Sequence, residues 1–206
     1  MYKDKVTTFQ KALDFILSPL QEGGYANDSN DLGGETYCGI ARNFHPSWEG
    51  WAIIDDAKEA HPYYRKEMFR FNDYIDEKGI ALKVQSFYME NFWKPLRLEK
   101  VVNENIAIKI FDMSVNLGVA RGSNMVQTCL NLMNYKDNYE LKVDNIIGDV
   151  TANLINLKTE KDNGEFLLNL LTLSQGNFFM KSAQSNPNQK KYIKGWIKSL
   201  NIKVTV

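Results

Sequence analysis

The stretch from Phe15 to Ile40 constrains this chain most, because two glycine pairs divide it into three segments of different character. Before the first pair, apolar residues recur at three- and four-residue steps, which is typical of a helix with one face against a core: Phe9, Leu13, Ile16 and Leu20. The pair Gly23 and Gly24 predicts the end of that helix, since glycine tolerates the left-handed conformation that closes a helix. A polar loop and a short extended segment follow, so the chain has to change from helix to hairpin here.

Two carboxyl groups flank this change of structure. Glu22 is expected in the last helical turn, beside backbone carbonyls and apolar neighbours that raise the pKa of a carboxyl group. Asp31 lies in the wet polar loop, where it is expected to stay ionised. A carboxylic acid that can donate a proton near neutral pH, together with an ionised carboxylate, is the acid and base pair of a glycosidase.

Two other interpretations of the loop are open. One is a glycine-rich polar turn with no chemical role. The other is calcium binding, because Asp28, Asn30 and Gly33 match the first, third and sixth positions of an EF-hand loop. That match fails at Leu32, and also at Gly39, where an EF-hand needs a bidentate glutamate.

The residues of this stretch resemble the EGGYxNxxxDxGGxTxxGI signature of the glycoside hydrolase family 108 muramidases, often labelled secretion activator proteins. The matching positions are Glu22-Gly23-Gly24-Tyr25-x-Asn27 and Asp31-x-Gly33-Gly34-x-Thr36-x-x-Gly39-Ile40. The order of Glu, Asp and Thr is also similar to that of phage-type lysozymes. The resemblance implies that Glu22 is the catalytic acid and that Asp31 and Thr36 place the attacking water, which favours inversion. Tyr25 and Tyr37 are candidates for contacts with the substrate.

The chain departs from the family pattern at two places. Pro19 lies three residues before Glu22, where a proline removes a helical hydrogen bond and predicts a kink. Cys38 stands where the family usually has an aromatic residue, which changes local packing and leaves the catalytic acid unaffected.

A second resemblance begins at the string FDMSVNLG, residues 111–118, which is similar to the FDxAVNxG string that opens the family's predicted peptidoglycan-binding segment. It continues through residues 127–132, 143–151 and 186–200. Asn116 in this string is a further candidate for binding the substrate.

Asp112 and Asn116 also have structural interpretations. The two residues lie four apart and so share one face of a predicted helix over residues 105–116. Asp112 could make a hydrogen bond within the helix or a salt bridge to Lys109. Asn116 could be a left-handed residue at the helix end.

Composition excludes some classes of function. Lys plus Arg and Asp plus Glu number 25 each, so no strong net field directs the chain to nucleic acid. The first residues lack the continuous apolar core of a secretory signal peptide, and no run approaches membrane-spanning length. The protein is therefore expected to be made in the cytoplasm and to reach the cell wall or periplasm through a holin or a secretion system, as the resemblance implies.

Neither the histidines nor the cysteines suggest a metal or a cofactor. His45 and His61 are the only histidines and have no ligand partner in sequence. Cys38 and Cys129 are most simply two reduced thiols, with a disulfide between them as the alternative. Trp48 and Trp51 could stack on sugar rings, although core packing is the commoner role of such residues.

The sequence predicts a mainly helical α+β protein with a lysozyme-like bilobed fold. A small hairpin lobe is expected from residues 24–26 facing residues 35–40, beside a helical lobe. Residues 1–96 form the predicted catalytic region and residues 97–206 the predicted peptidoglycan-binding region, packed as one compact unit. Helices are expected within residues 53–71, 82–93, 105–116, 166–179 and 192–200.

The leading functional hypothesis is an N-acetylmuramidase that hydrolyses the β-1,4 bonds of peptidoglycan. A non-catalytic peptidoglycan-binding or secretion-assisting protein is the first alternative, because a glycan cleft can bind without cleaving. A lytic transglycosylase is the second, and Asp31 argues against it, since that reaction needs no second carboxylate.

Overall fold

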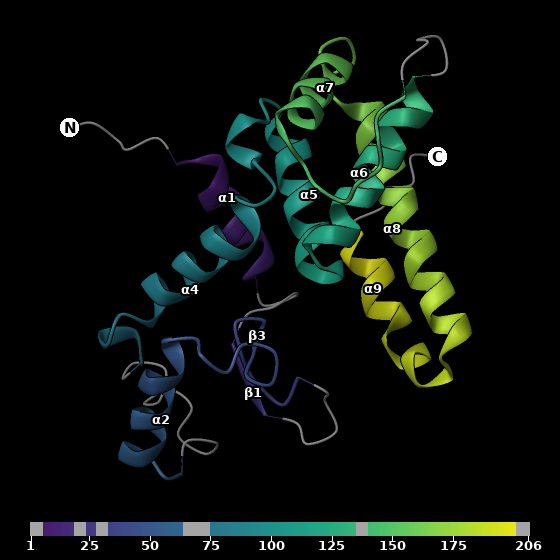
Figure 1. Ribbon diagram of the computed structural model, residues 1–206. Helices are drawn as coiled ribbons and strands as arrows, with labels where there is room; N and C mark the ends of the chain where they lie inside the picture. The colour runs from purple at the N-terminus through teal and green to yellow at the C-terminus, as the bar shows by residue number, and fades with distance from the viewer. Residues whose placement is uncertain (1–5, 19–23, 28–32, 64–74, 135–139, 201–206) are drawn as a thin grey trace, which may run out of the picture. The chain divides into compact units, whose positions relative to one another are not determined.

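The computed structural model of the chain describes residues 6–18, 24–27, 33–63, 75–134 and 140–200 (Figure 1). It is a mainly helical α+β protein with a small antiparallel sheet, which confirms the predicted fold class. The chain divides into two compact units. Residues 1–12 and 92–206 form one, called here the outer unit because its sequence encloses the other, and residues 13–91 form the second, called the inserted unit. The division expected between residues 96 and 97 stays a prediction.

The described part of the inserted unit contains the sheet and helices α2 (Gly50–Ala60) and α4 (Ile80–Tyr88). Strands β1 (Tyr25–Asn27), β2 (Glu35–Tyr37) and β3 (Ile40–Ala41) pair antiparallel in that order. Tyr25 lies opposite Tyr37, and Thr36 lies between Ala26 and Ala41. Helix α2 follows the sheet, and α4 packs against α2 and continues into the π-helical turn η1 (Met89–Trp93).

The strand expected over residues 35–40 is wrong in one respect, because a tight turn divides it. Cys38 and Gly39 occupy the two turn positions with φ of 48° and 77°. Positive φ at both positions is the requirement of a type I′ turn, whose twist matches that of the flanking strands. The family motif therefore needs Gly39 for backbone geometry, and the short hairpin brings Ile40 into the core.

Helix α1 (Thr8–Ile16) ends earlier than the sequence periodicity predicts. Leu17 lies in a turn and Ser18 in a bend, so the helix does not run uninterrupted to Glu22 as expected. Ser18 precedes Pro19, and the residue before a proline is disfavoured in helical conformation. The predicted kink at Pro19 and the predicted position of Glu22 lie outside the described residues.

The core of the inserted unit lies where α2 and α4 meet. Burial follows helical periodicity on both helices, which explains why these segments fold as amphipathic helices. The fully or almost fully buried side chains are Ile40, Trp51, Ile54, Ala57, Ile80, Val84, Phe87 and Tyr88. The Tyr88 hydroxyl donates a hydrogen bond to the Cys38 carbonyl at 2.7 Å, so the helix holds the I′ turn of the sheet.

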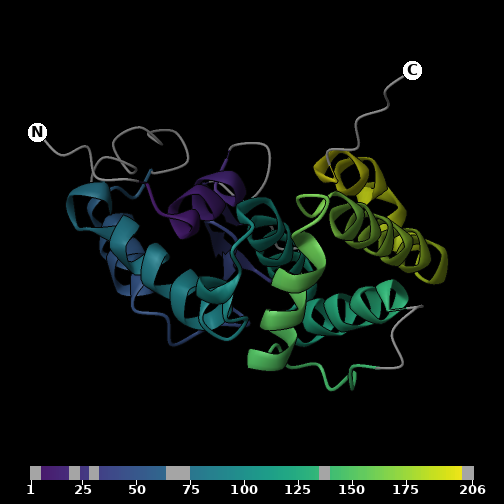
Figure 2. The same ribbon diagram turned by 90° about the horizontal axis from the view of Figure 1, so that it is seen from above.

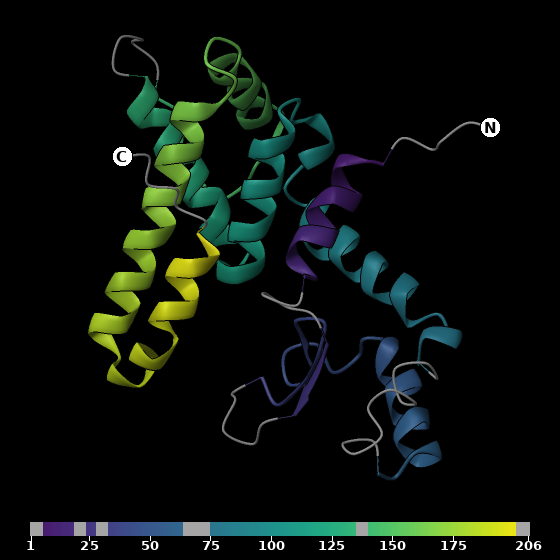
Figure 3. The same ribbon diagram turned by 180° about the vertical axis from the view of Figure 1, so that it is seen from behind.

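The outer unit is helical in all of its described elements. These are η2 (Leu98–Lys100), α5 (Glu104–Leu117), α6 (Val119–Met133), α7 (Asp149–Thr159), α8 (Glu165–Ser185), η3 (Pro187–Tyr192) and α9 (Ile193–Ser199). Helices α5, α6 and α8 pack against one another, and α9 lies along α8 (Figures 2 and 3). None of the helices in the described part of the chain is long and apolar enough to cross a membrane.

The join between α5 and α6 is close and glycine-dependent. Gly118 ends α5 with φ of 86°, so the left-handed residue is Gly118 and not Asn116, as one interpretation of the sequence had it. Four residues into α6, a Cβ at Gly122 would lie 2.1 Å from the Ser114 Oγ and 3.2 Å from the Ser114 Cα. The two helices therefore approach so closely that any larger residue at position 122 would push against Ser114.

The first helix supplies part of the outer unit's core. Phe9 is buried, and its ring meets those of Trp93 and Phe111 edge to face at centroid distances of 5.3 and 6.1 Å. The Lys11 ammonium forms an ion pair with Glu104 at 2.5 Å. The N-terminal residues thus pack against residues that follow the inserted unit in the chain.

Candidate functional site

The predicted catalytic carboxyl groups, Glu22 and Asp31, lie outside the described residues. Thr36 lies in the central strand β2 with a half-buried side chain. Its hydroxyl donates to the Gly34 carbonyl at 3.2 Å. The candidate water-placing threonine is therefore held on the central strand of the sheet, and its catalytic role stays a prediction.

Glu35 is the carboxylate of strand β2, and it has several charged and polar partners. Its Oε1 accepts hydrogen bonds from the Tyr25 hydroxyl and the Lys58 ammonium, each at 2.7 Å. Its Oε2 pairs with the Arg42 guanidinium at 3.1 Å. With only 9% of its side chain exposed, Glu35 joins β1, the residue after β3 and helix α2 in one network.

Arg42 extends this network to α2. Its Nη2 lies 2.7 Å from Asp55, and its guanidinium stacks on the Trp51 ring at 4.5 Å. Lys58 also reaches Asp55 at 2.8 Å. Burial alone would raise the pKa of Asp55, but the hydrogen bonds from the two cations hold it below its ordinary value. These contacts tie helix α2 to the strands that carry Tyr25 and Thr36.

Glu35 is not among the site residues predicted from sequence, although it stands inside the signature between Gly34 and Thr36. One signal was present: a carboxylate in a short strand directly beside two glycines is unusual unless cations surround it. The cations come from other elements, so spacing alone does not reveal them.

The two tyrosines predicted to contact substrate lie in different environments. The Tyr25 hydroxyl is bonded to Glu35 at the edge strand. Tyr37 is 8% exposed, and its ring stacks on Trp48 at 6.4 Å, while burial raises the pKa of its phenol. Tyr37 therefore contributes packing, and substrate contacts of both residues stay predictions.

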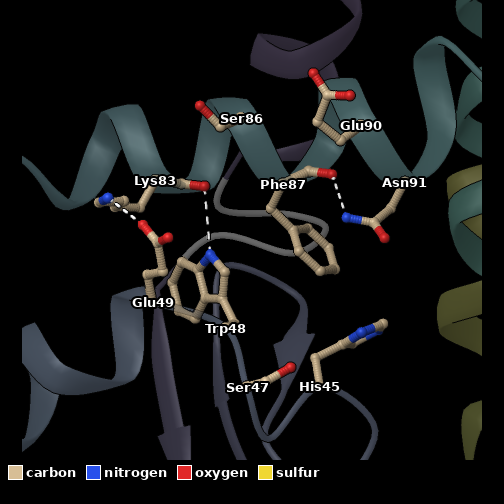
Figure 4. Close-up of a pocket in the computed structure, with 9 residues that line it drawn as sticks. All are labelled: His45, Ser47, Trp48, Glu49, Lys83, Ser86, Phe87, Glu90 and Asn91. Atoms are coloured by element: carbon tan, nitrogen blue, oxygen red, sulfur yellow. Dashed lines mark hydrogen bonds and ion pairs between the residues drawn. The ribbon is translucent and has the colours of Figure 1, made fainter.

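A pocket of about 320 Å³ opens in the inserted unit between residues 45–49 and α4 (Figure 4). Of the two tryptophans considered from the sequence, Trp51 is buried in the core and Trp48 lines this pocket. The pocket is lined by His45, Ser47, Trp48, Glu49, Lys83, Ser86, Phe87, Glu90 and Asn91.

Asn116, the third predicted substrate contact, is an exposed residue of the outer unit that bonds to the buried Asp112. Its amide donates to the Asp112 carbonyl and carboxylate at 2.8 and 3.1 Å. Lys109 donates to Gln175 of α8 at 2.6 Å. Burial raises the pKa of Asp112 and lowers that of Lys109. The hydrogen bond within the helix is the alternative that the structure supports for Asp112, and a substrate contact of Asn116 stays a prediction.

Both cysteines are free thiols, as the simpler interpretation predicts. Cys129 is buried in α6, and Cys38 is half-buried in the I′ turn. Burial raises the pKa of each thiol, so neither is prepared for reaction as a thiolate.

Comparison with known families matches the chain in two adjoining parts. Residues 13–118 match the family model described as Glycosyl hydrolase 108, and residues 121–201 match the model described as Predicted Peptidoglycan domain. Together they support a role in peptidoglycan hydrolysis or binding. A search of curated proteins finds no relative that matches the chain.

A solved structure shares the fold. The structure of Brucella abortus SagA is similar with a TM-score of 0.63 and 21% sequence identity, over 94% of this chain and 90% of that one. The similarity therefore extends through both matched regions.

Proposed function

The chain belongs to the glycosyl hydrolase 108 family, and on that premise we propose that it is a lysozyme-like N-acetylmuramidase. It would hydrolyse the β-1,4 bond that follows N-acetylmuramic acid in peptidoglycan. The match of residues 121–201 to a peptidoglycan domain supports the same substrate.

In this proposal Glu22 protonates the leaving oxygen, while Asp31 and Thr36 place the attacking water. General acid catalysis by a positioned carboxylic acid contributes about 10² to 10⁴ in rate. Thr36 would act from the central strand of the sheet, with Tyr25 on the neighbouring strand. Tyr25, Tyr37 and Asn116 remain the proposed contacts with the glycan.

The observation that carries the proposal is the network that Glu35 forms with Tyr25, Arg42 and Lys58, which ties strands β1 and β2 to helix α2. Catalysis needs groups held within a few tenths of an ångström, which a short exposed hairpin cannot do alone. Here the Glu35 side chain, which is only 9% exposed, takes three charged or hydroxyl partners from different elements, and Tyr88 holds the turn at Cys38. Such rigidity is expected of a hairpin that positions a water molecule.

Glu22→Gln tests the assignment. We expect this variant to lose about 10² or more of the rate of murein cleavage while keeping the melting temperature of the wild type, because the amide cannot donate a proton as an acid. Turbidity clearing of purified cell wall measures the rate. Glu59→Gln, at an exposed position of α2, is the matched control and should cleave normally.

Mass spectrometry of the muropeptides released by the wild type decides among the reaction classes. Reducing-end products support the muramidase. Anhydro products would instead indicate a lytic transglycosylase, and binding without any released product would indicate the non-catalytic alternative. Cleavage by Glu22→Gln within a few-fold of the wild type would contradict the role of Glu22.

We also propose that the protein acts on the cell wall or in the periplasm after export by a holin or a secretion system. The support is the location of its proposed substrate, which lies outside the cytoplasmic membrane. Peptidoglycan strands are the proposed partner in either case.

A further inference from the structure

We propose that the pocket between residues 45–49 and α4 binds one uncharged N-acetylhexosamine ring of a glycan strand. The choice of a glycan rests on the proposed function, whereas the pocket and its selectivity rest on the contacts described below. At about 320 Å³ the pocket is near the lower end of the sizes of small-molecule sites, roughly 300 to 1,000 Å³. It therefore fits one sugar ring.

Trp48 forms a wall of the pocket that is fixed in position. Its indole N–H donates to the Lys83 carbonyl of α4 at 3.3 Å, as Figure 4 shows, and its ring plane lies within 18° of that of Tyr37. A Cβ at Gly50 would lie 2.3 Å from two carbons of the indole, so glycine at this position makes room for the ring. An aromatic side chain held on several sides can receive a sugar without reorganising, which reduces the cost of binding.

Polar groups line the rim, and a turn of π-helix places two of them. Glu90 and Asn91 lie in η1, a conformation that is rare and is often found at functional sites. The Asn91 amide donates to the Phe87 carbonyl at 2.8 Å, which holds this side chain on the His45 side of the pocket (Figure 4). With the exposed hydroxyls of Ser47 and Ser86, these groups can donate to and accept from sugar hydroxyls.

The charges select against an anionic ligand. Among the described residues that line the pocket, Lys83 is the single cation with a fixed charge, and it is ion-paired with Glu49. Burial lowers the pKa of His45, so its imidazole is neutral at pH 7. A second carboxylate, that of Glu90, also lines the pocket. The lactyl carboxylate of muramic acid and the carboxylates of a stem peptide are therefore disfavoured, and N-acetylglucosamine is favoured.

Binding can be followed by NMR of the intact chain with N,N′-diacetylchitobiose as the probe. We expect the indole N–H signal of Trp48 and the ring signals of His45 to shift and saturate. The ring signals of His61, which does not line the pocket, should stay in place, which makes them an internal control. Muramyl dipeptide, which carries carboxylates, should produce no shift at Trp48.

Two variants test the lining directly. Glu90→Ala and Ser86→Trp should each raise the dissociation constant at least about tenfold, since one removes a hydrogen-bonding group and the other fills the space. The matched controls are Glu77→Ala and Ala81→Trp, at exposed positions that do not line the pocket, and they should bind like the wild type. Melting temperatures establish that all four variants are folded.

Unchanged affinity in both pocket variants, or tighter binding of muramyl dipeptide than of the disaccharide, would overturn the inference. Its failure is distinguishable from failure of the proposed function. A protein that shows the Trp48 shift but never clears cell wall would bind the sugar at this pocket without being a muramidase. A protein that clears cell wall without the shift would be a muramidase that lacks this subsite.

Discussion

At the scale of one residue, the backbone conformation at Cys38 is one that asparagine adopts more easily than cysteine. Its φ of 48° lies in the left-handed region, which costs most L-residues about 1 to 2 kcal/mol and which Asn tolerates best after Gly. Cys38→Asn creates the Asn-Gly pair favoured by type I′ turns. We expect this variant to raise the free energy of unfolding by about 1 kcal/mol, measured by urea denaturation.

Cys38→Val is the control, because it also removes the thiol. A β-branched residue is strained at positive φ, so we expect a loss of about 1 to 2 kcal/mol in the free energy of unfolding. The backbone hydrogen bonds of this residue with Gly24 and with the Tyr88 hydroxyl persist in both variants. Equal stabilities of the Asn and Val variants would mean that side-chain packing at position 38 outweighs the turn.

The same scale shows what sequence can and cannot predict of the candidate site. The signature predicts that Tyr25 and Thr36 lie on neighbouring strands, and the sheet confirms this arrangement. It does not predict that Glu35 bonds to Arg42 and Lys58, because those cations are brought together only when the sheet packs on α2. The pairing of neighbouring strands can be predicted from nearby residues, whereas a charge network depends on how distant elements pack together.

At the scale of helices, Gly122 sets how closely α5 and α6 approach. Gly122→Ala would place a methyl group 2.1 Å from the Ser114 Oγ and 3.2 Å from its Cα, so the helix backbones would have to separate. We expect a loss of about 1 to 3 kcal/mol in the free energy of unfolding, the usual cost of overpacking. Thermal and urea denaturation measure it.

Gly195→Ala provides the comparison. Gly195 lies inside α9, and a Cβ there has no atom within 4 Å. Alanine has the higher helix propensity by roughly 1 kcal/mol, so this substitution should stabilise the protein. Opposite signs in the two variants isolate the close contact from helix propensity, and destabilisation of both by the same amount would contradict this account.

Helix ends and weakly patterned helices are where prediction from sequence falls short. Residues 105–116 are predicted well, because α5 has strong apolar periodicity and Gly118 stops it. Helix α7 has no such pattern, since it exposes Val150 and Leu157 and buries Thr151 and Thr159. The Thr159 hydroxyl donates hydrogen bonds to backbone carbonyls of the same helix, so this polar side chain can be buried. A search for apolar residues at helical spacing does not detect such a position.

At the scale of the whole molecule, the outer unit depends on residues from both ends of the chain. Phe9→Ala removes a ring that is 5% exposed and packs on Trp93 and Phe111. We expect the free energy of unfolding of the outer unit to fall by about 3 to 5 kcal/mol. The indole signal of Trp196 during urea denaturation reports on this unit.

Phe166→Ala is the matched control within the same unit, because Phe166 is 50% exposed. Its effect should stay within about 0.5 kcal/mol. A loss at Phe9 no larger than that at Phe166 would show that the N-terminal residues do not stabilise the outer unit.

The insertion of residues 13–91 into the outer unit also sets the order in which the protein can be completed on the ribosome. Phe9 is synthesised first, but Trp93 and Phe111 emerge only after the entire inserted unit. Once residue 91 has been synthesised, the strands and helices of the inserted unit are present, so this unit can fold before Trp93 and Phe111 are available to pack on Phe9. Until the later helices leave the exit tunnel, the apolar face of α1 around Phe9 has no outer unit to cover it. During this interval, chaperones and proteases can reach that face in the nascent chain.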